Sequence, residues 1–294
     1  RNKGIEISLG GIPVRTKDFQ WDVDFNIAKN DNKLVRLNDE INEYLLEGNR
    51  FYYFWYLKAK VGSPIGVITT MSRFKRNEQG ELLLKPTSSA GWGGGYSPAL
   101  ETDVEKEVGN FQPDWTGGFS TSVRYKEFRL AASFDFMIGG QMVSWTNLWS
   151  TGSGTSIATA RLNNRGVNER EGINRGGGVY VTGVDETTGE KVSTYMNAYN
   201  YYHYQAYYDN DYWVYDRSYL KLRELSLSYQ VPASALQKLR IGLNDASVSF
   251  VASNPWLIYS ACPNLDPSES GSNWLEQGQA ASTRSFGLTV KLGF

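Results

Sequence analysis

Residues 113–140 alternate apolar and polar side chains on both sides of a short turn at 125–128, in the stretch "PDWTGGFSTSVRYKEFRLAASFDFMIGG". A period of two places each set on one face of a β-strand. The pattern therefore predicts a hairpin with one apolar face and one polar face. The members of the apolar face are Phe119, Val123, Tyr125, Phe128, Leu130, Ala132, Phe134, Phe136 and Ile138.

The same alternation recurs along the chain and brings the number of predicted strands to seven. Within 219–231 the phase changes, since Leu220 and Leu222 occupy even positions and Leu225 and Leu227 odd ones. One extra residue near Arg223–Glu224 restores the phase, which predicts a β-bulge. The five further strands are predicted at residues 4–9, 19–27, 219–231, 247–256 and 285–294.

Three weaker elements are predicted between these strands. A short hairpin is expected within residues 51–74, and one helical turn is expected behind Pro232. A short amphipathic helix ending at Gly48 is expected from apolar residues at helical spacing. These residues are Leu34, Leu37, Ile41, Tyr44 and Leu45.

The connections between the strands alternate between short and long. The long ones cover about 31–115, 139–217 and 257–280. A compact soluble domain rarely carries structureless loops of that length, whereas outer-membrane barrels combine short periplasmic turns with long extracellular loops. We therefore predict an all-β transmembrane antiparallel barrel whose apolar face meets lipid. Because seven strands is an odd number, residues 1–294 are expected to form the C-terminal part of a larger barrel.

Composition and charge narrow the range of functions. The net charge of −1 argues against a nucleic-acid partner held by a basic patch. No apolar run of about 18 residues exists, so no transmembrane helix is expected. The single Cys and single His offer no disulfide and no multi-His metal cluster, and we expect no enzyme, no metal and no cofactor. The charged residues of the polar faces are expected to form a hydrated barrel lumen: Asp22, Asp24, Arg124, Asp135, Lys221, Arg223, Glu224 and Lys291.

One segment is exceptionally aromatic, "YMNAYNYYHYQAYYDNDYWVYD" at residues 195–216. It is expected to be a loop at the barrel mouth, and two interpretations remain open. It is either a self-packed or interface patch, or a stacking surface for sugar rings, whose CH faces pack well on aromatic side chains. The residues expected to contact cargo or a lid are Tyr195, Tyr199, Tyr201, Tyr202, Tyr204, Tyr207, Tyr208 and Trp213.

An ordered set of segments resembles the closing third of TonB-dependent transporters of the SusC/RagA type. The segments include "PVRTKDFQWDVDFNIAKNDNKLVRL", the hairpin quoted above, "DRSYLKLRELSLSYQVP", "SNPWLIY", "NLDPSE" and "TRSFGLTVKLGF", with a terminal Phe294. Each segment alone is weak, but together they follow the family's order over nearly the whole chain. The family usually has a Leu-Trp pair where this sequence has Pro255 and Trp256.

The resemblance implies a 22-stranded barrel with an N-terminal plug in the outer membrane. It also implies a SusD-like surface lipoprotein as a lid, coupling to the TonB complex through a part absent from this sequence, and import of oligosaccharides or oligopeptides. A dimer of transporter–lid pairs is compatible with it. Two alternatives stay open: a TonB-dependent transporter for a siderophore or cobalamin, and a soluble secreted β-sandwich that binds carbohydrate.

Overall fold

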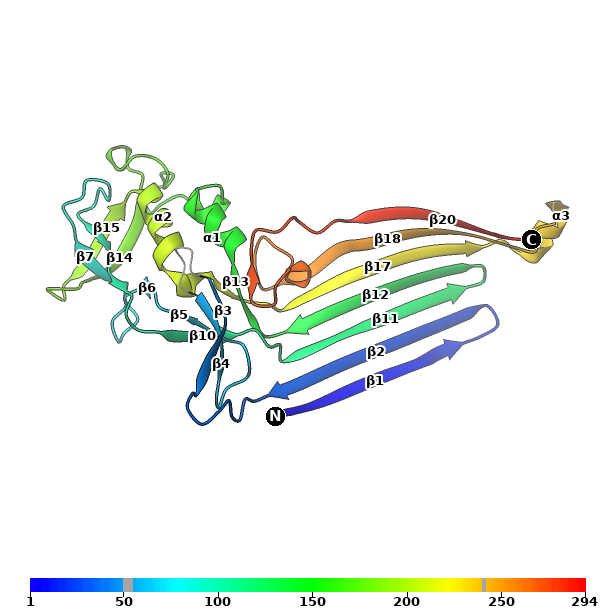
Figure 1. Cartoon of the computed structure of the whole chain (residues 1–294). Coiled ribbons are helices and arrows are strands. Elements are labelled where there is room, and N and C mark those ends of the chain that lie inside the picture. Colours follow the sequence, from blue (N-terminus) through cyan, green and yellow to red (C-terminus); the bar gives the residue numbers. More distant parts are fainter. Residues whose placement is uncertain (50–54, 240–241) are drawn as a thin grey trace.

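The computed structural model describes residues 1–49, 55–239 and 242–294. Its main element is a seven-stranded antiparallel sheet in the order β1-β2-β11-β12-β17-β18-β20, which follows the order of these strands in the chain (Figure 1). The seven predicted strands are confirmed, and β1, β2 and β18 are longer than expected. They are β1 Asn2–Arg15, β2 Phe19–Asn32, β11 Trp115–Tyr125, β12 Phe128–Ile138, β17 Tyr219–Gln230, β18 Asp245–Ser260 and β20 Ser285–Gly293.

The register places the apolar side chains in continuous rows across the sheet, since residues directly opposite in an antiparallel pair share a face. One row lies beside the short turns and is mostly aromatic, with Phe128 and Tyr229 rings 4.8 Å apart. A row deeper in the sheet contains Phe119 and Phe134, whose rings stack at 4.2 Å. The first row runs Phe19, Tyr125, Phe128, Tyr229, Val248 and Val290.

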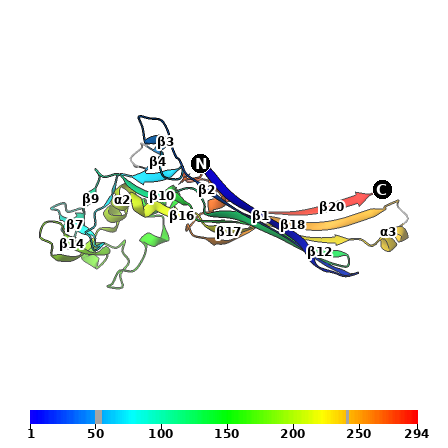
Figure 2. The ribbon, with the colours of Figure 1, turned by 90° about the horizontal axis from the view of Figure 1, so that it is seen from below.

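The apolar face of this sheet is open to its surroundings. Phe250 and Leu288 lie opposite each other in one apolar row, and these side chains are 46% and 71% exposed. Seen from below, the seven strands form one curved layer, and the folded connections gather beyond one of its ends (Figure 2). A β-sandwich would instead bury such a face against a second sheet.

The predicted bulge is confirmed at Arg223. Ser133 pairs with Glu224 and the next residue, Phe134, pairs with Leu222, so Arg223 has no partner on β12. The turn behind Pro232 is also confirmed as helix α3 (Ala233–Leu239). Helix α3 lies at the short-turn end of the sheet (Figure 1).

The long connections are folded rather than structureless. The first contains β3 Glu43–Asn49, β4 Trp55–Lys60, β5 Val67–Thr70, β6 Arg73–Phe74, β7 Leu83–Pro86, β8 Tyr96–Pro98, β9 Leu100–Glu101 and β10 Lys106–Asn110. The second contains β13 Gln141–Ser144, α1 Trp145–Gly152, η1 Ile157–Thr159, η2 Ile173–Arg175, β14 Val179–Asp185, β15 Lys191–Met196, α2 Ala198–Tyr208, η3 Asn210–Trp213 and β16 Val214–Asp216. The third contains η4 Pro267–Glu269 and β19 Leu275–Glu276.

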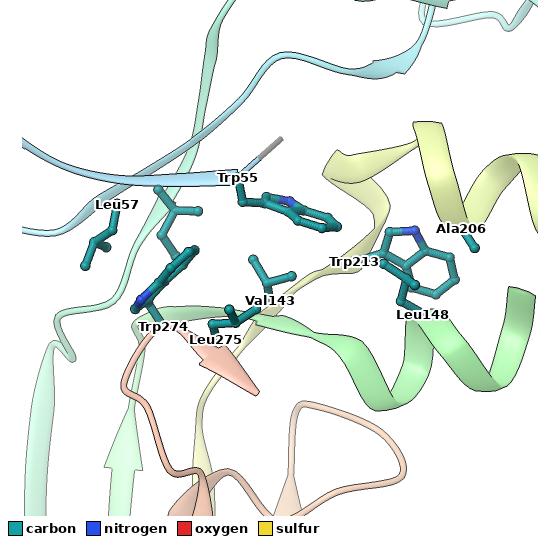
Figure 3. Packing of buried hydrophobic residues seen from close by; sticks show 9 residues of the cluster. Trp55, Leu57, Val143, Leu148, Ala206, Trp213, Trp274 and Leu275 are labelled. Carbon is teal, nitrogen blue, oxygen red and sulfur yellow. The ribbon is translucent and has the colours of Figure 1, made fainter. Parts of the chain in front are cut away.

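Two small sheets join different connections to one another. In the sheet β15-β14-β7-β8 the first connection pairs with the second, and in β16-β13-β19 the second pairs with the third. A hydrophobic cluster then includes residues from all three connections, among them Trp55, Trp213 and Trp274 (Figure 3). The connections therefore form one interlocked unit at this end of the sheet.

The helix predicted over 34–48 is wrong. Residues Glu43–Asn49 form the edge strand β3, which pairs with β4, and a register shift lies between Leu45 and Glu47. Pairing with β4 satisfies the backbone in a way that the local helical spacing does not reveal. The hairpin predicted within 51–74 is confirmed as β4 and β5, although its first residues, up to 54, lie outside the described part of the chain.

Candidate functional site

The aromatic segment 195–216 is mainly a helix, not the loop that its sequence suggested. Helix α2 begins after Asn197, whose side-chain oxygen accepts a hydrogen bond from the Asn200 backbone N–H at 3.2 Å. Ala198, Tyr202 and Ala206 recur every four residues and are all buried. A spacing of four residues indicates a helix. The pattern is hard to recognise in the sequence because the tyrosines between these positions are also largely apolar.

Two of the predicted contact residues lie in the protein interior. Tyr202 is 4% exposed, and its hydroxyl donates to Glu169 Oε2 at 2.5 Å and accepts from Arg161 Nη2 at 3.2 Å. Burial, together with the Glu169 carboxylate, raises the pKa of Tyr202 to about 12. Trp213 is 1% exposed and donates from Nε1 to the Gln205 carbonyl at 3.2 Å (Figure 3). Trp213 cannot touch cargo in this conformation, whereas Tyr202 lines a cavity between α1 and α2.

Two further tyrosines pack between α2 and the first connection. The Tyr201 ring meets Phe74 edge-on at 6.2 Å, and the Tyr204 ring meets Trp92 at 5.0 Å. Burial raises the pKa of Tyr201 well above its ordinary value. These partly buried side chains hold α2 against β6 and the loop before β8.

Of the remaining predicted residues, Tyr199 and Tyr208 are exposed, whereas Tyr195 and Tyr207 are partly buried. Tyr199 is 68% exposed and stacks on His203, with ring centroids 5.3 Å apart and planes 14° apart. His203 in turn lies 4.6 Å from the Tyr207 ring, so one side of α2 carries a continuous aromatic row. Tyr208 is 37% exposed.

Tyr195 lies away from that row, on strand β15. The guanidinium of Arg165 lies 3.5 Å above the centre of its ring, and the Tyr180 ring lies 5.2 Å away. The structure thus divides the predicted residues into an interior group and a surface group. Burial argues against direct contact with cargo or a lid for Trp213. Such contact stays a prediction for Tyr195, Tyr199, Tyr201, Tyr202, Tyr204, Tyr207 and Tyr208.

A second cluster, of charged residues, lies where the third connection meets the polar face of the sheet. Lys221 on β17 is 1% exposed and contacts Asp266 at 2.7 Å and Glu269 at 2.6 Å. Arg223 contacts Asp135 at 2.8 Å and Glu269 at 2.7 Å. The sequence predicted Asp135, Lys221 and Arg223 as wall residues, but nothing in the pattern indicated that Asp266 and Glu269 would reach them.

The basic residues of this cluster lower the pKa values of the two carboxyls on the third connection. Hydrogen bonds from Lys221 and Arg223 hold the pKa of Glu269 below its usual range. Burial opposes ionisation of Asp266, but hydrogen bonds from Lys221 and Ser268 still lower its pKa. Both carboxylates are therefore charged at neutral pH, and they tie η4 to the polar face of the sheet.

Other candidate chemistry is weak. Cys262 is fully buried, and burial raises its pKa to about 12, so its thiol stays protonated at neutral pH. Across residues 1–49, 55–239 and 242–294, no group of three or more His, Cys, Asp or Glu side chains is arranged to hold a metal ion. Nor does that part of the chain contain a helix long and apolar enough to cross a membrane.

The sheet defines the class of fold. Seven antiparallel strands with one apolar and one hydrogen-bonding face, short turns at one end and long connections at the other form the wall of an outer-membrane-type β-barrel. No family model matches the sequence. The chain is 27% identical to TonB-dependent receptor P3 of Formosa agariphila, over 100% of this chain and 28% of that protein.

Further comparisons agree. The chain is 24% identical to TonB-dependent receptor P26 of the same organism, over 94% of this chain and 26% of that protein. It matches the solved RagAB peptide transporter with a TM-score of 0.64 and 18% identity, over 100% of this chain and 29% of that one. The RagAB peptide importer in its open-open state gives 0.66 and 17%, over 100% and 28%.

These findings confirm the resemblance to TonB-dependent receptors of the SusC/RagA type and the predicted fold class. The curated relatives are TonB-dependent receptors, and the solved structures share the fold. The chain spans about 28% of the length of the first of these relatives.

Proposed function

We propose that this chain forms part of the barrel wall of an outer-membrane importer for oligosaccharides or oligopeptides. Uptake is driven by TonB through a part of the protein outside this sequence, and a SusD-like surface lipoprotein closes the extracellular side. The observation that carries the proposal is the open apolar face of the seven-stranded sheet, with Leu288 71% exposed, opposite a hydrogen-bonded polar face. Lipid is the solvent that such a face fits.

The comparisons support the transport role. The curated relatives are named TonB-dependent receptors, and the similar solved structures are described as a peptide transporter or importer. Those proteins are only distantly similar to this chain, so their cargo does not identify the cargo of this protein. The test therefore includes both oligosaccharides and oligopeptides.

The experiment deletes the gene for the full-length protein in its own host and restores it from a plasmid. Growth and uptake are measured on defined glycans and peptides, with and without a functional TonB complex. We expect the protein in the outer-membrane fraction, released by detergent but not by a carbonate wash, and a TonB-dependent loss of uptake for one cargo class. Release without detergent would favour the soluble carbohydrate-binding sandwich. If uptake of a siderophore or cobalamin alone is lost, the alternative of a TonB-dependent transporter for those compounds is favoured.

A further inference from the structure

A cavity of about 290 Å³ lies between the C-terminal end of α1 and the N-terminal end of α2. Its walls come from residues 151–154 and Thr159, from Arg170, and from Asn197 and the first half of α2 as far as Tyr202. Ligand pockets have volumes of about 300–1,000 Å³, so this one suits a single sugar unit or a chain end rather than a whole oligosaccharide. Tyr199 and Tyr202 were predicted as contact residues, but the cavity itself could not be predicted, because its walls come from segments far apart in the chain.

An exposed aromatic ring forms one wall of the cavity. Tyr199 is 68% exposed although it lines the cavity, and its ring is held by stacking on His203. A ring that is both exposed and fixed in orientation offers a flat apolar face without losing much side-chain freedom on binding. The CH face of a pyranose ring packs on such a surface.

Arg170 supplies a positive charge that forms no ion pair with a carboxylate of the described residues. Of the residues that line the cavity, Arg170 is the one with a formal charge. The nearby carboxylates Glu169 and Glu171 pair with Arg161 and Arg175 instead, within the part of the chain that the structure describes. An anion in the cavity would therefore meet the positive charge of Arg170 directly. The Glu169 carboxylate lies behind the cavity wall, where the Tyr202 hydroxyl donates to it and Arg161 offsets its charge.

The guanidinium of Arg170 is already held in position. Its Nε donates to the Thr159 carbonyl at 3.1 Å, and its Nη2 donates to the Ser156 carbonyl at 3.1 Å and to the Gly154 carbonyl. No hydrogen bond from its Nη1 to the described residues is formed. Asn197 uses its side-chain oxygen to cap α2, which leaves its amide nitrogen as a second donor at the cavity wall. Donors fixed in this way favour carboxylate or sulfate oxygens.

We propose that this cavity binds an anionic sugar unit, carboxylated or sulfated, with its ring on Tyr199 and its acidic group at Arg170. The proposal rests on the proposed function, since it names the cargo class of that importer. It commits to a carbohydrate because an exposed aromatic wall and a donor-rich rim match a sugar ring that carries an acidic group. An acidic peptide is the competing outcome of the test.

The test uses the full-length protein, purified in detergent from its own outer membrane. Binding is measured by calorimetry with four probes of equal length: a uronic-acid tetrasaccharide, a sulfated tetrasaccharide, a neutral tetrasaccharide and an acidic tetrapeptide. We expect at least one anionic sugar to bind roughly tenfold or more tighter than the neutral one, the scale of one charge-assisted hydrogen bond. That preference should shrink as salt is raised.

Single substitutions in the cavity test whether the probes bind there. Arg170→Gln should abolish the preference for the anionic probe, whereas Tyr199→Ala should weaken the anionic and neutral sugars alike. Because Arg170 also holds the 154–159 turn, Tyr199→Ala is the variant that tests the cavity without that structural cost. Arg284→Gln and Tyr212→Ala are the matched controls, since both residues are exposed and lie outside the cavity, and they should bind like the wild type.

Three results would overturn the proposal: equal affinity for neutral and anionic sugars, tighter binding of the acidic peptide, or unchanged binding in Arg170→Gln and Tyr199→Ala. Uptake assays distinguish a wrong cavity assignment from a wrong transport function. If the wild type imports a cargo in a TonB-dependent way and both variants import it equally well, only the cavity assignment fails. If no cargo is imported, the proposed function fails.

Discussion

Arg223 holds the carboxylate of Asp135 through two parallel hydrogen bonds, from Nε to Oδ1 at 2.8 Å and from Nη2 to Oδ2 at 2.8 Å. Its Nη1 donates to Glu269 Oε1 at 2.7 Å, so one guanidinium joins β17, β12 and the third connection. Arg223 is the bulged residue of β17, which explains why an extra residue lies at this point of the strand. The bulge directs a fork-shaped donor at two carboxylates.

The first prediction concerns Lys221, whose side chain is 1% exposed between Asp266 and Glu269. Lys221→Met should leave two carboxylates without their buried partner and release the third connection, at a cost of roughly 3–5 kcal/mol. Limited proteolysis of intact cells should then cut within 261–284. The control Lys106→Met removes a more exposed pair with Asp211, worth about 1 kcal/mol or less, and should not change the cleavage pattern. Equal protection in both variants would show that η4 is held by other contacts.

The second prediction follows from the lowered pKa values of Asp266 and Glu269. A carboxyl whose folded pKa is depressed stabilises the folded form above its unfolded pKa, and this stability is lost as the pH falls through the folded value. The third connection should therefore stay protected at neutral pH and loosen below about pH 4, where free carboxyls take up protons. Hydrogen exchange of residues 261–284 measures this. The protection of these amides relative to their intrinsic exchange rate at each pH is the quantity to compare, and equal protection at pH 7 and pH 3 would contradict the prediction.

The third prediction concerns the two faces of the barrel wall. Leu225 lies in an apolar row between Ala132 and Ala252, so an arginine fits there without a clash. Leu225→Arg places its charge in the lipid and should cost roughly 2–4 kcal/mol, which reduces assembly into the outer membrane. The neighbouring Ser226→Arg points into the aqueous lumen and should assemble normally. Heat-resistant migration on gels distinguishes the two, and the opposite result would mean that the faces are inverted.

The sheet could be predicted from the sequence because its cause is local. Alternation with a period of two fixes the strand faces, and the change of phase at Leu222–Leu225 fixes the bulge at Arg223. Turns such as 125–128 link strands that are neighbours in both sequence and space. Each of these features depends on a few adjacent residues.

The connections could not be predicted because their structure depends on distant partners. The segment 43–49 has helical spacing but forms a strand because β4 lies beside it. Trp213 is buried because Trp55 and Trp274 pack in the same cluster, from opposite ends of the chain. The candidate site could be predicted only in part for the same reason. The aromatic residues are evident in the sequence, but which of them are buried depends on distant partners.

The last prediction tests the surface part of the aromatic segment against its interior part. Tyr199→Ser with Tyr208→Ser removes two exposed rings, so the fold should keep its stability. Tyr202→Ser removes a buried ring and the hydrogen bond to Glu169, and should destabilise the connections by roughly 3–5 kcal/mol. Thermal unfolding of the purified proteins measures this difference.

Two functional readouts then decide what the exposed rings contact. If they contact cargo, the double variant should lose uptake while the surface lipoprotein still co-purifies. If they contact the lid, uptake and co-purification should fall together, because an interface residue supports both. Barrel assembly should be unchanged in either case, since the rings lie on the connections and not on the lipid-facing strands. Normal uptake and normal co-purification would show that Tyr199 and Tyr208 contact neither cargo nor lid, and the contact prediction would be wrong for these two residues.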